Sequence, residues 1–285
     1  MRWDYGSVYK EIRRNKHLTQ EEVCGNYINR STLTRFENNQ TIPSYELMRF
    51  LLKQVDMTFE EFEYLCNYYQ PSERQQLLYD IDNLKNPTND QLIGIVERCE
   101  KHLKKESDDI PIIRRKQLIE TVISVRNSNK FSQISKEAQM LTDLQMTELT
   151  RCNNWYHNDI IILSTLLYSF PDKTIEDISK LLLQRLDKYK DFKRIKPTIL
   201  SHYQFLAYYY LNKKNFTKTI AFATKLTTLA KQEKRYDQLA RGYVYLGIAD
   251  KKQELIDKGL QILELTEEQR ILNILKSFIK EIQTD

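Results

Sequence analysis

The segment NRSTLTRFEN, residues 29–38, combines the side chains that hydrogen-bond to nucleic acid with a short apolar stripe. It holds two arginines and three hydroxyl groups, and Leu33 and Phe36 are spaced to share one face of a helix. Arginine can form two hydrogen bonds with a guanine edge, and Ser or Thr can bond to phosphates or base edges. We therefore predict a helix with one polar face turned toward double-stranded DNA.

The preceding segment, LTQEEVCGNY, supplies the helix that must position this polar face. Thr19 is a natural N-cap, and Glu22 three residues later completes a capping box. Val23, Cys24 and Tyr27 are expected to face the core. Two helices joined by a short turn form a helix-turn-helix, whose second helix enters the major groove. The predicted DNA contacts are Arg30, Ser31 and Arg35 toward bases, Gln20 and Asn38 toward phosphates, with Thr32 and Thr34 beside them.

The charge of this region supports contact with phosphates. Residues 10–53 carry eight Lys or Arg against five Asp or Glu, whereas further acids cluster at 56–63. The basic excess therefore lies around the proposed groove face, as phosphate binding requires. The alternative interpretation is an ordinary amphipathic surface helix that happens to carry two arginines.

The whole chain is expected to be all-α. Its 285 residues include only six Gly and six Pro, while strong helix formers are abundant. We predict a five-helix helix-turn-helix domain at 1–67 and a repeat domain of paired helices at 68–285. The repeat-domain helices are expected at 73–85, 88–105, 110–128, 131–143, 147–169, 172–190, 196–212, 215–232, 235–248, 252–264 and 267–282.

A loose internal period supports a helical-repeat solenoid. Tyr203, Leu206 and Ala207 recur forty residues later as Tyr243, Leu246 and Gly247, and forty residues earlier as Leu163, Leu166 and Leu167. A large residue, Leu and a small residue at this spacing are typical of the first helix of a tetratricopeptide repeat, although the usual period is about 34. The alternative is a helical bundle without repeats.

The segment LTQEEV…INRSTLTRFEN resembles the helix-turn-helix of phage-repressor (XRE) type, and more closely the Rgg/MutR group of Gram-positive transcription regulators. Thr34, Arg35, Phe36 and Glu37 match the end of that group's recognition helix. Asn38-Asn39 departs from the Arg-Gly or Asn-Gly that such families often have. The resemblance implies a helical-repeat domain that senses a short imported signalling peptide, as in quorum sensing, and so alters transcription.

Two groups of residues are candidates for contacting such a peptide. Asn side chains can both donate to and accept from a peptide main chain, and Asn is uncommon in the middle of a helix. The repeat region 185–252 also carries sixteen Lys or Arg against five Asp or Glu. We therefore expect an apolar peptide with an acidic group, bound on the face lined by the first helix of each pair. The predicted contacts are Arg151, Asn154, Trp155, Asn158, Gln204, Tyr208, Arg241 and Tyr245.

Other functional classes find little support. The four cysteines are far apart and form no CxxC pair, so neither a metal site nor any cofactor is expected. The sequence has no Gly-rich phosphate loop, HExxH or GxSxG, and we expect no enzyme. No apolar run reaches about 18 residues and the N-terminus is not a signal peptide, so a cytoplasmic protein without membrane contact is expected.

The predicted assembly is a homodimer through the repeat domain, because helix-turn-helix proteins usually bind two half-sites. The stripe of Ile271, Ile274, Leu275, Phe278 and Ile282 is expected either to cap the solenoid or to pair with a second chain. Two alternatives remain: a repressor of phage or stress type without a peptide ligand, and a helical-repeat scaffold that binds a protein.

Overall fold

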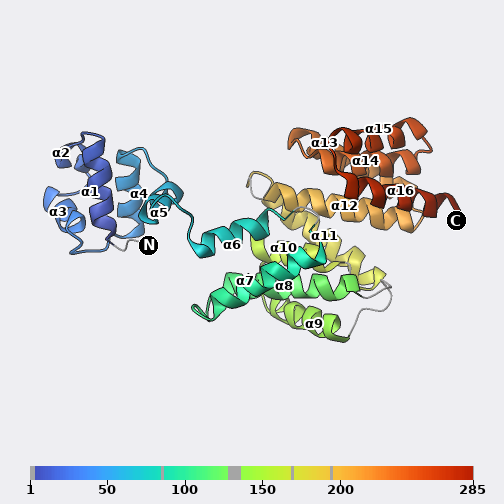
Figure 1. Cartoon of the computed structure of the whole chain (residues 1–285), viewed down its shortest axis with the longest axis horizontal. Helices are drawn as coiled ribbons and strands as arrows, with labels where there is room; N and C mark the ends of the chain where they lie inside the picture. The colour runs from blue at the N-terminus through green and yellow to red at the C-terminus, as the bar shows by residue number, and fades with distance from the viewer. Residues whose placement is uncertain (1–3, 85–86, 128–135, 168–169, 193–194, 285) are drawn as a thin grey trace. The chain divides into compact units, whose positions relative to one another are not determined.

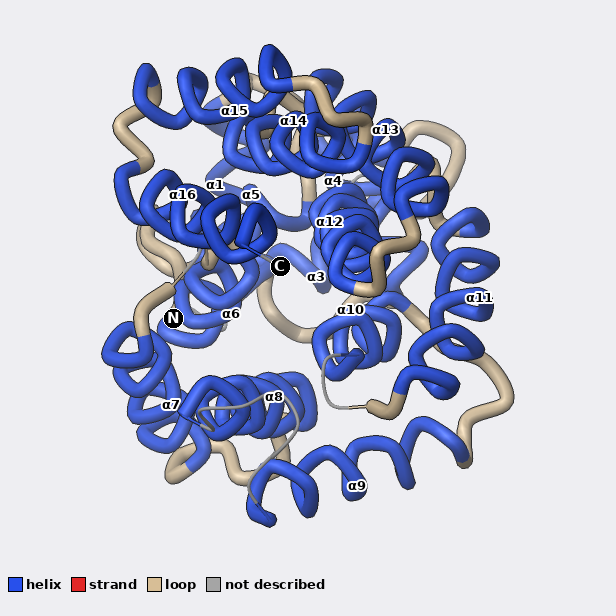
Figure 2. Tube along the Cα trace, turned by 90° about the vertical axis from the view of Figure 1, so that its right-hand side faces the viewer, coloured by secondary structure: helices blue, strands red, loops and turns tan. Residues whose placement is uncertain are grey.

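The computed structural model describes residues 4–84, 87–127, 136–167, 170–192 and 195–284. Within these ranges it contains sixteen α-helices. Figures 1 and 2 show their arrangement, with helices and loops but no strand among the described residues. The predicted all-α class is therefore confirmed. The chain divides into two compact units, Met1–Ile123 and Ser124–Asp285.

The first unit begins with five short helices around one core. They are α1 (Tyr5–Asn15), α2 (Gln20–Cys24), α3 (Arg30–Glu37), α4 (Tyr45–Gln54) and α5 (Phe59–Cys66). Leu33 and Phe36 of α3 are buried in this core with Leu51 and Tyr9, and the Tyr9 hydroxyl donates to the Leu51 carbonyl at 3.1 Å. The predicted inward orientation of Leu33 and Phe36 is confirmed.

Two aromatic residues beside this core are exposed, and one of them, Tyr27, was expected to face it. Tyr27 is 59% exposed and stacks on Phe50, with ring centroids 4.3 Å apart. Phe59 is 37% exposed and stacks on Tyr45 in the same way. Each ring covers a neighbouring ring at the surface, because the turn before α3 and the first turn of α5 lie at the edge of the five-helix core.

Three longer helices complete the first unit: α6 (Glu73–Asp82), α7 (Asn89–Leu103) and α8 (Ile110–Asn127). Their core is separate from that of α1–α5 and centres on Leu77, Leu92, Cys99 and Ile112. Thr88 and Ser72 each begin a helix with a capping box, in which the third helical residue is Gln.

The second unit starts with a correction to the predicted helices. A break between 143 and 147, followed by one helix over 147–169, was expected. Instead α9 runs through that break as Lys136–Thr150, and α10 begins only at His157 and ends at Leu166. Residues 151–156 are a loop, which suits Asn153 and Asn154 because Asn favours turns over helix interiors. The predicted start at 131 and end at 169 lie outside the described residues.

The remaining helices match their predicted positions closely: α11 (Asp172–Lys188), α12 (Lys196–Asn212), α13 (Phe216–Gln232), α14 (Tyr236–Ala249), α15 (Gln253–Leu265) and α16 (Gln269–Thr284). Helix α14 packs between α13 and α15 (Figure 2). A Cβ on Gly247 would lie 2.8 Å from the Lys252 carbonyl oxygen, and one on Gly259 would lie 2.7 Å from that of Ala240. Small residues therefore permit close helix packing here, as the repeat pattern predicted.

Helix α16 caps the end of this unit. Ile271, Leu272, Leu275 and Phe278 are buried against the α12–α15 core, whereas Ile274 is 47% exposed. Ile274 was expected on the packed stripe and instead faces outward. The predicted alternative of a capping helix is therefore the one observed within the chain.

Successive helices are joined by tight turns that contain a lysine where glycine is usual. Lys214, Lys234 and Lys251 adopt φ of 54°, 53° and 55° in the turns after α12, α13 and α14. After α12, Asn215 N donates to the Tyr210 carbonyl at 2.9 Å, the bond that defines a Schellman motif. These turns explain how a chain with so few glycines ends its helices.

In the part of the chain that the structure describes, no helix has the length and apolarity needed to span a bilayer.

Candidate nucleic-acid interface and candidate ligand face

Helix α3 separates its side chains into a buried face and an exposed polar face. Leu33, Phe36 and Glu37 are buried. On the other side the predicted DNA contacts Arg30, Ser31, Thr32, Arg35 and Asn38 are exposed, and Thr34 is half-buried. The structure thus brings six of the seven predicted residues to one accessible side of the helix or its C-terminal end.

A buried ion pair fixes the orientation of α3. Arg13 of α1 is 7% exposed and Glu37 is 2% exposed. Arg13 Nε and Nη2 donate to the two Glu37 carboxylate oxygens at 2.5 and 2.9 Å, and Arg13 Nη1 donates to the Leu18 carbonyl at 2.6 Å. Hydrogen bonding to Glu37 raises the pKa of Arg13 against the opposing effect of burial, so the guanidinium stays charged. Neither residue's role was anticipated from sequence.

Gln20 connects this ion pair to the exposed face. Its side-chain Nε2 donates to Glu37 Oε2 at 2.9 Å, while its Oε1 accepts from Arg30 Nε at 3.1 Å and from the Thr34 hydroxyl at 3.4 Å. The predicted capping box of Thr19 and Glu22 is present and starts α2 at Gln20. In the structure Gln20 therefore positions Arg30. Only the second hydrogen of the Gln20 amide group is left to donate to a phosphate, as was predicted for this residue.

Asn39 joins the end of α3 to the start of α1. Its φ of 56° gives the left-handed conformation that was expected where α3 ends. Its Oδ1 accepts from the backbone N–H groups of Gly6 and Ser7 at 2.9 and 3.3 Å, which α1 could not satisfy internally. The two helices approach so closely that a Cβ on Gly6 would lie 1.7 Å from the Phe36 carbonyl oxygen.

A shallow cavity of about 470 Å³ lies beside this junction. Lys10 and Arg14 of α1 line it together with Asn38, and Lys10 Nζ donates to Asn38 Oδ1 at 3.2 Å. Two basic side chains therefore flank the end of α3, although Glu11 also contributes to the lining. Sequence reasoning did not select Lys10 or Arg14.

The predicted ligand-contact residues fall into two groups, and the first is not arranged as expected. Arg151, Asn154 and Asn158 do not share a helix face, since Arg151 and Asn154 lie in the α9–α10 loop and Asn158 in the first turn of α10. The Asn154 side chain accepts from Arg185 Nη1 at 3.2 Å, and Trp155 Nε1 donates to the Leu149 carbonyl at 3.2 Å. The loop is thus held against α9 and α11.

The second group does assemble, around three aromatic rings from alternate helices. The Tyr208 ring of α12 lies 6.3 Å from the Tyr245 ring of α14 and 5.2 Å from the Phe278 ring of α16. The Tyr245 and Phe278 rings are 6.1 Å apart. Gln204 is half-buried one turn before Tyr208. Phe278 was predicted as a packing residue and was not expected in this group.

Arg241 lies on the same side of α14, one turn before Tyr245. Burial raises the pKa of the Tyr245 hydroxyl, and the charge of Arg241 opposes that shift, which places the guanidinium close to the phenol. Gln238 is one turn further back and is 6% exposed. Its Oε1 has no hydrogen-bond partner among the described residues, a cost of about 1–3 kcal/mol for a buried acceptor. This unsatisfied acceptor is invisible to sequence reasoning.

The basic excess of the repeat region is not gathered on this face, contrary to expectation. Lys218, Lys225 and Lys231 belong to α13, the second helix of its pair. Some of the charge is also neutralised, because Lys213 and Lys218 pair with Asp172 and Glu176 of α11 at 2.6 and 3.4 Å. Among the predicted residues in α12 and α14, Arg241 alone carries a positive charge to the ligand face.

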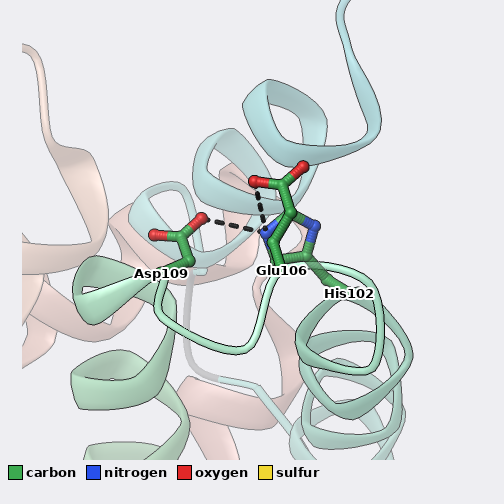
Figure 3. A group of neighbouring side chains, drawn as sticks. All are labelled: His102, Glu106 and Asp109. Atoms are coloured by element: carbon green, nitrogen blue, oxygen red, sulfur yellow. Dashed lines mark hydrogen bonds and ion pairs between the residues drawn. The ribbon is translucent and has the colours of Figure 1, made fainter.

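A His-Glu-Asp cluster in the first unit has the donor types of a metal site (Figure 3). His102 Nε2 lies 2.9 Å from Asp109 Oδ2 and 3.8 Å from Glu106 Oε2. Arg74, however, donates to both Asp109 oxygens at 2.6 and 3.1 Å, and this bonding lowers the Asp109 pKa. Because the Arg74 guanidinium already binds both oxygens of Asp109, we interpret the cluster as an ion pair that connects α6, α7 and the start of α8.

Two family models match separate parts of the chain. Residues 10–62 match the helix-turn-helix family, and residues 99–277 match the family described as HTH-type transcriptional regulator Rgg, C-terminal domain. These are families of transcription regulators and not of enzymes, as predicted. No curated protein matches the sequence.

Solved structures share the fold over nearly the whole chain. A regulator-like protein from Listeria monocytogenes EGD-e has a TM-score of 0.75 at 18% identity, covering 98% of this chain and 96% of that one. ComR from S. thermophilus, in complex with DNA and its signalling peptide ComS, has a TM-score of 0.66 at 14% identity and covers 96% and 97%. Bacillus thuringiensis PlcR, in complex with the peptide PapR7 and DNA, has the same TM-score and identity and covers 95% and 98%.

The Rgg C-terminal model alone spans more than half of the residues, and a helix-turn-helix precedes it. The chain therefore belongs to the Rgg family of DNA-binding transcription regulators.

Proposed function

We propose that this regulator senses a short signalling peptide through its helical repeats and changes its binding to promoter DNA in response. Residues 1–67 form the DNA-binding domain in this proposal, and residues 68–285 form the sensing and dimerisation domain. The protein acts in the cytoplasm as a homodimer that presents two α3 helices to a palindrome-like site.

The DNA side of the proposal rests on the exposed face of α3. Arg30 and Arg35 are the residues that can distinguish bases, because each can bond twice to guanine. Ser31, Thr32 and Thr34 add contacts to base edges or phosphates, while Asn38 lies beside Lys10 and Arg14 of α1 and is suited to a phosphate. Arg13 and Glu37 fix the helix beneath these side chains.

The peptide side rests on one observation, the three-ring cluster of Tyr208, Tyr245 and Phe278 beside Arg241 and Gln238. Aromatic rings suit the apolar side chains of a peptide. Arg241 suits a carboxylate, and Gln238 Oε1 suits a main-chain N–H group. The structural neighbours ComR and PlcR were each solved with DNA and a peptide, which supports a peptide as the ligand class.

The loop group has a smaller part in this proposal. Arg151, Asn154 and Asn158 are exposed and Trp155 is half-buried, so they can contact the more polar end of a peptide from the α9–α10 loop. Their separate placement means that their contribution can be measured independently of the ring cluster.

A gel-mobility shift with the DNA upstream of the chain's own gene tests the first half of the proposal. A scaffold protein gives no shift, whereas a regulator gives a shift that weakens with salt because phosphate contacts release counterions. Light scattering at micromolar concentration should give the mass of a dimer. A monomeric mass would contradict the proposed assembly.

Calorimetry with synthetic peptides from short reading frames beside the gene tests the second half. Tyr208→Ala is expected to weaken binding about tenfold, equivalent to about 1.4 kcal/mol. Tyr236→Ala is the matched control, because it removes another tyrosine ring from the same unit. Tyr236 begins α14, is 52% exposed and is not part of the ring cluster. Heat from no peptide, together with a normal gel shift, would favour a repressor without a peptide ligand.

A further inference from the structure

Two lysines from different helices converge on one buried tyrosine. Lys231 lies near the end of α13 and Lys258 in the middle of α15, on either side of α14. Their ammonium groups are 5.5 and 4.8 Å from the ring centroid of Tyr243 in α14. Tyr243 is 7% exposed, so its ring is held in place by the core that includes Leu226 and Leu239.

Within the described residues, no carboxylate lies within ion-pair distance of Lys231 or Lys258, whereas Lys213, Lys218 and Lys276 all have acidic partners. Both lysines are exposed. Their two ammonium groups near one phenol repel each other at a cost that water partly screens. An anion bound between them would remove that cost.

The hydroxyl of Tyr243 responds to these charges. Burial of the phenol raises its pKa, but Lys231 and Lys258 together outweigh burial, and the net pKa lies below the usual value of 10.0. An acidified phenol is a better hydrogen-bond donor to an anion. The two lysines thus make the Tyr243 hydroxyl a third hydrogen-bond donor beside their own N–H groups.

We propose that Lys231, Lys258 and the Tyr243 hydroxyl form a binding site for a doubly charged phosphate group, either inorganic phosphate or a phosphate monoester. Two ammonium groups balance a charge of about −2, and the three donors match the three terminal oxygens of a monoester. A phosphodiester of a nucleic-acid backbone carries one charge and fits less well. A single carboxylate leaves one ammonium unbalanced.

This site is separate from both surfaces that carry the proposed function. Its lysines lie on α13 and α15, whereas the ring cluster lies on α12, α14 and α16. Tyr243 and Tyr245 are two residues apart on α14 and so point away from one another. A phosphorylated metabolite could therefore bind to the repeat unit while a peptide occupies the other face.

Titration of the full-length protein with inorganic phosphate, followed by ³¹P NMR, tests the proposal. The expected result is saturable binding that weakens tenfold or more in Lys231→Gln and in Lys258→Gln, and measurably in Tyr243→Phe. Lys225→Gln is the matched control, since the Lys225 ammonium lies 5.9 and 5.5 Å from the Tyr203 and Phe222 rings without a second ammonium at either ring. Unchanged melting temperatures in the lysine variants would show that they remain folded.

The charge of the ligand provides the second arm of the test. Methyl phosphate should bind as inorganic phosphate does, and dimethyl phosphate should bind at least tenfold more weakly. Methyl phosphate affinity should rise as pH increases through about 6, where a monoester loses its second proton, while sulfate affinity should not rise. Absence of saturable binding, or an equal loss in Lys225→Gln, would overturn the proposal.

Discussion

Helices α3 and α14 both carry arginine and hydroxyl groups along one side, but they present them in opposite ways. Arg35 of α3 is exposed, whereas Arg241 of α14 is 8% exposed. The polar face of α3 is held from below by buried charges, so it is ready to bind without rearrangement. The polar face of α14 is itself buried, so a ligand that reaches Gln238 and Arg241 must select or stabilise a different arrangement of the surrounding helices.

This difference fits the different tasks that we propose for the two regions. A preformed face suits a reader of DNA, whose affinity depends on fixed geometry. A closed face with an unsatisfied acceptor suits a sensor, because ligand binding there changes packing between helices. If this comparison holds, substitutions beneath α3 and in the core of the second unit should change the free energy of unfolding.

The largest effect is expected from removing one partner of the buried ion pair. Arg13→Met removes the cation that pairs with the buried Glu37, and Glu37→Leu removes the carboxylate that pairs with the buried Arg13. Each single substitution should destabilise the five-helix region by about 3–5 kcal/mol. The double variant should recover most of that stability in urea unfolding, yet bind DNA more weakly because Gln20 loses its anchor. Full recovery of DNA affinity in the double variant would show that the pair does not position α3.

The next effect is a pH dependence that belongs to the second unit. His202 in α12 is 1% exposed, and burial lowers its pKa to about 4 from 6.5. The folded state therefore holds a neutral imidazole that the unfolded chain protonates below pH 6.5. Stability is full above 6.5 and declines as pH falls toward 4, by about 3 kcal/mol in total.

His202→Leu should remove this decline. The measurement is the free energy of unfolding of wild type and variant, determined by chemical unfolding between pH 7 and pH 4. The first unit should behave differently, because the depressed pKa of Asp109 keeps its stability until pH falls below the usual 3.8. A wild-type to variant difference that does not change with pH would contradict the buried, neutral imidazole.

A moderate effect is expected where α1 crosses the end of α3. Gly6→Ala places a Cβ against the Phe36 carbonyl and should cost about 1–3 kcal/mol as the helices separate. Gly94→Ala in α7 is the control, since no atom lies within 4 Å of the added Cβ. That variant should instead gain about 0.5–1 kcal/mol from helix propensity. Equal effects on thermal unfolding would mean that the α1–α3 contact is looser than described.

The smallest effect concerns the turns of the second unit. Lys234→Gly relieves a left-handed lysine and should stabilise the α13–α14 turn by about 0.5–1 kcal/mol, since the relief of about 1–2 kcal/mol is partly offset by chain entropy. Thermal unfolding should show a small rise in melting temperature. A fall would indicate that the Lys234 side chain contributes more than its backbone costs.

The site in α3 could be predicted from the sequence more fully than the ligand face, for a physical reason. The polar face of α3 arises from ten consecutive residues with a capping box beside them, so the spacing of residues along the chain determines it. Leu33 and Phe36 were correctly placed inside, and Asn39 adopts the left-handed conformation expected where α3 ends. The pairing of Arg13 with Glu37 could not be foreseen, because it depends on how α1 crosses α3.

The ligand face depends on contacts between distant helices. Tyr208, Tyr245 and Phe278 are over thirty residues apart in sequence and meet only through repeat packing. The asparagines near 153 were correctly recognised as unusual for a helix, and they lie in the loop between α9 and α10 instead of in a helix.

The most direct test of the account is the affinity of the full-length protein for its own upstream DNA, measured by fluorescence anisotropy for three proteins. Arg35→Ala should weaken binding about 5- to 150-fold, the equivalent of about 1–3 kcal/mol. Its unfolding free energy should change by less than about 0.5 kcal/mol, because Arg35 is exposed. Lys101→Ala, an equal loss of charge from the exposed side of α7, should leave affinity nearly unchanged. Equal affinity of wild type and Arg35→Ala would contradict the assignment of α3 as the DNA-reading helix.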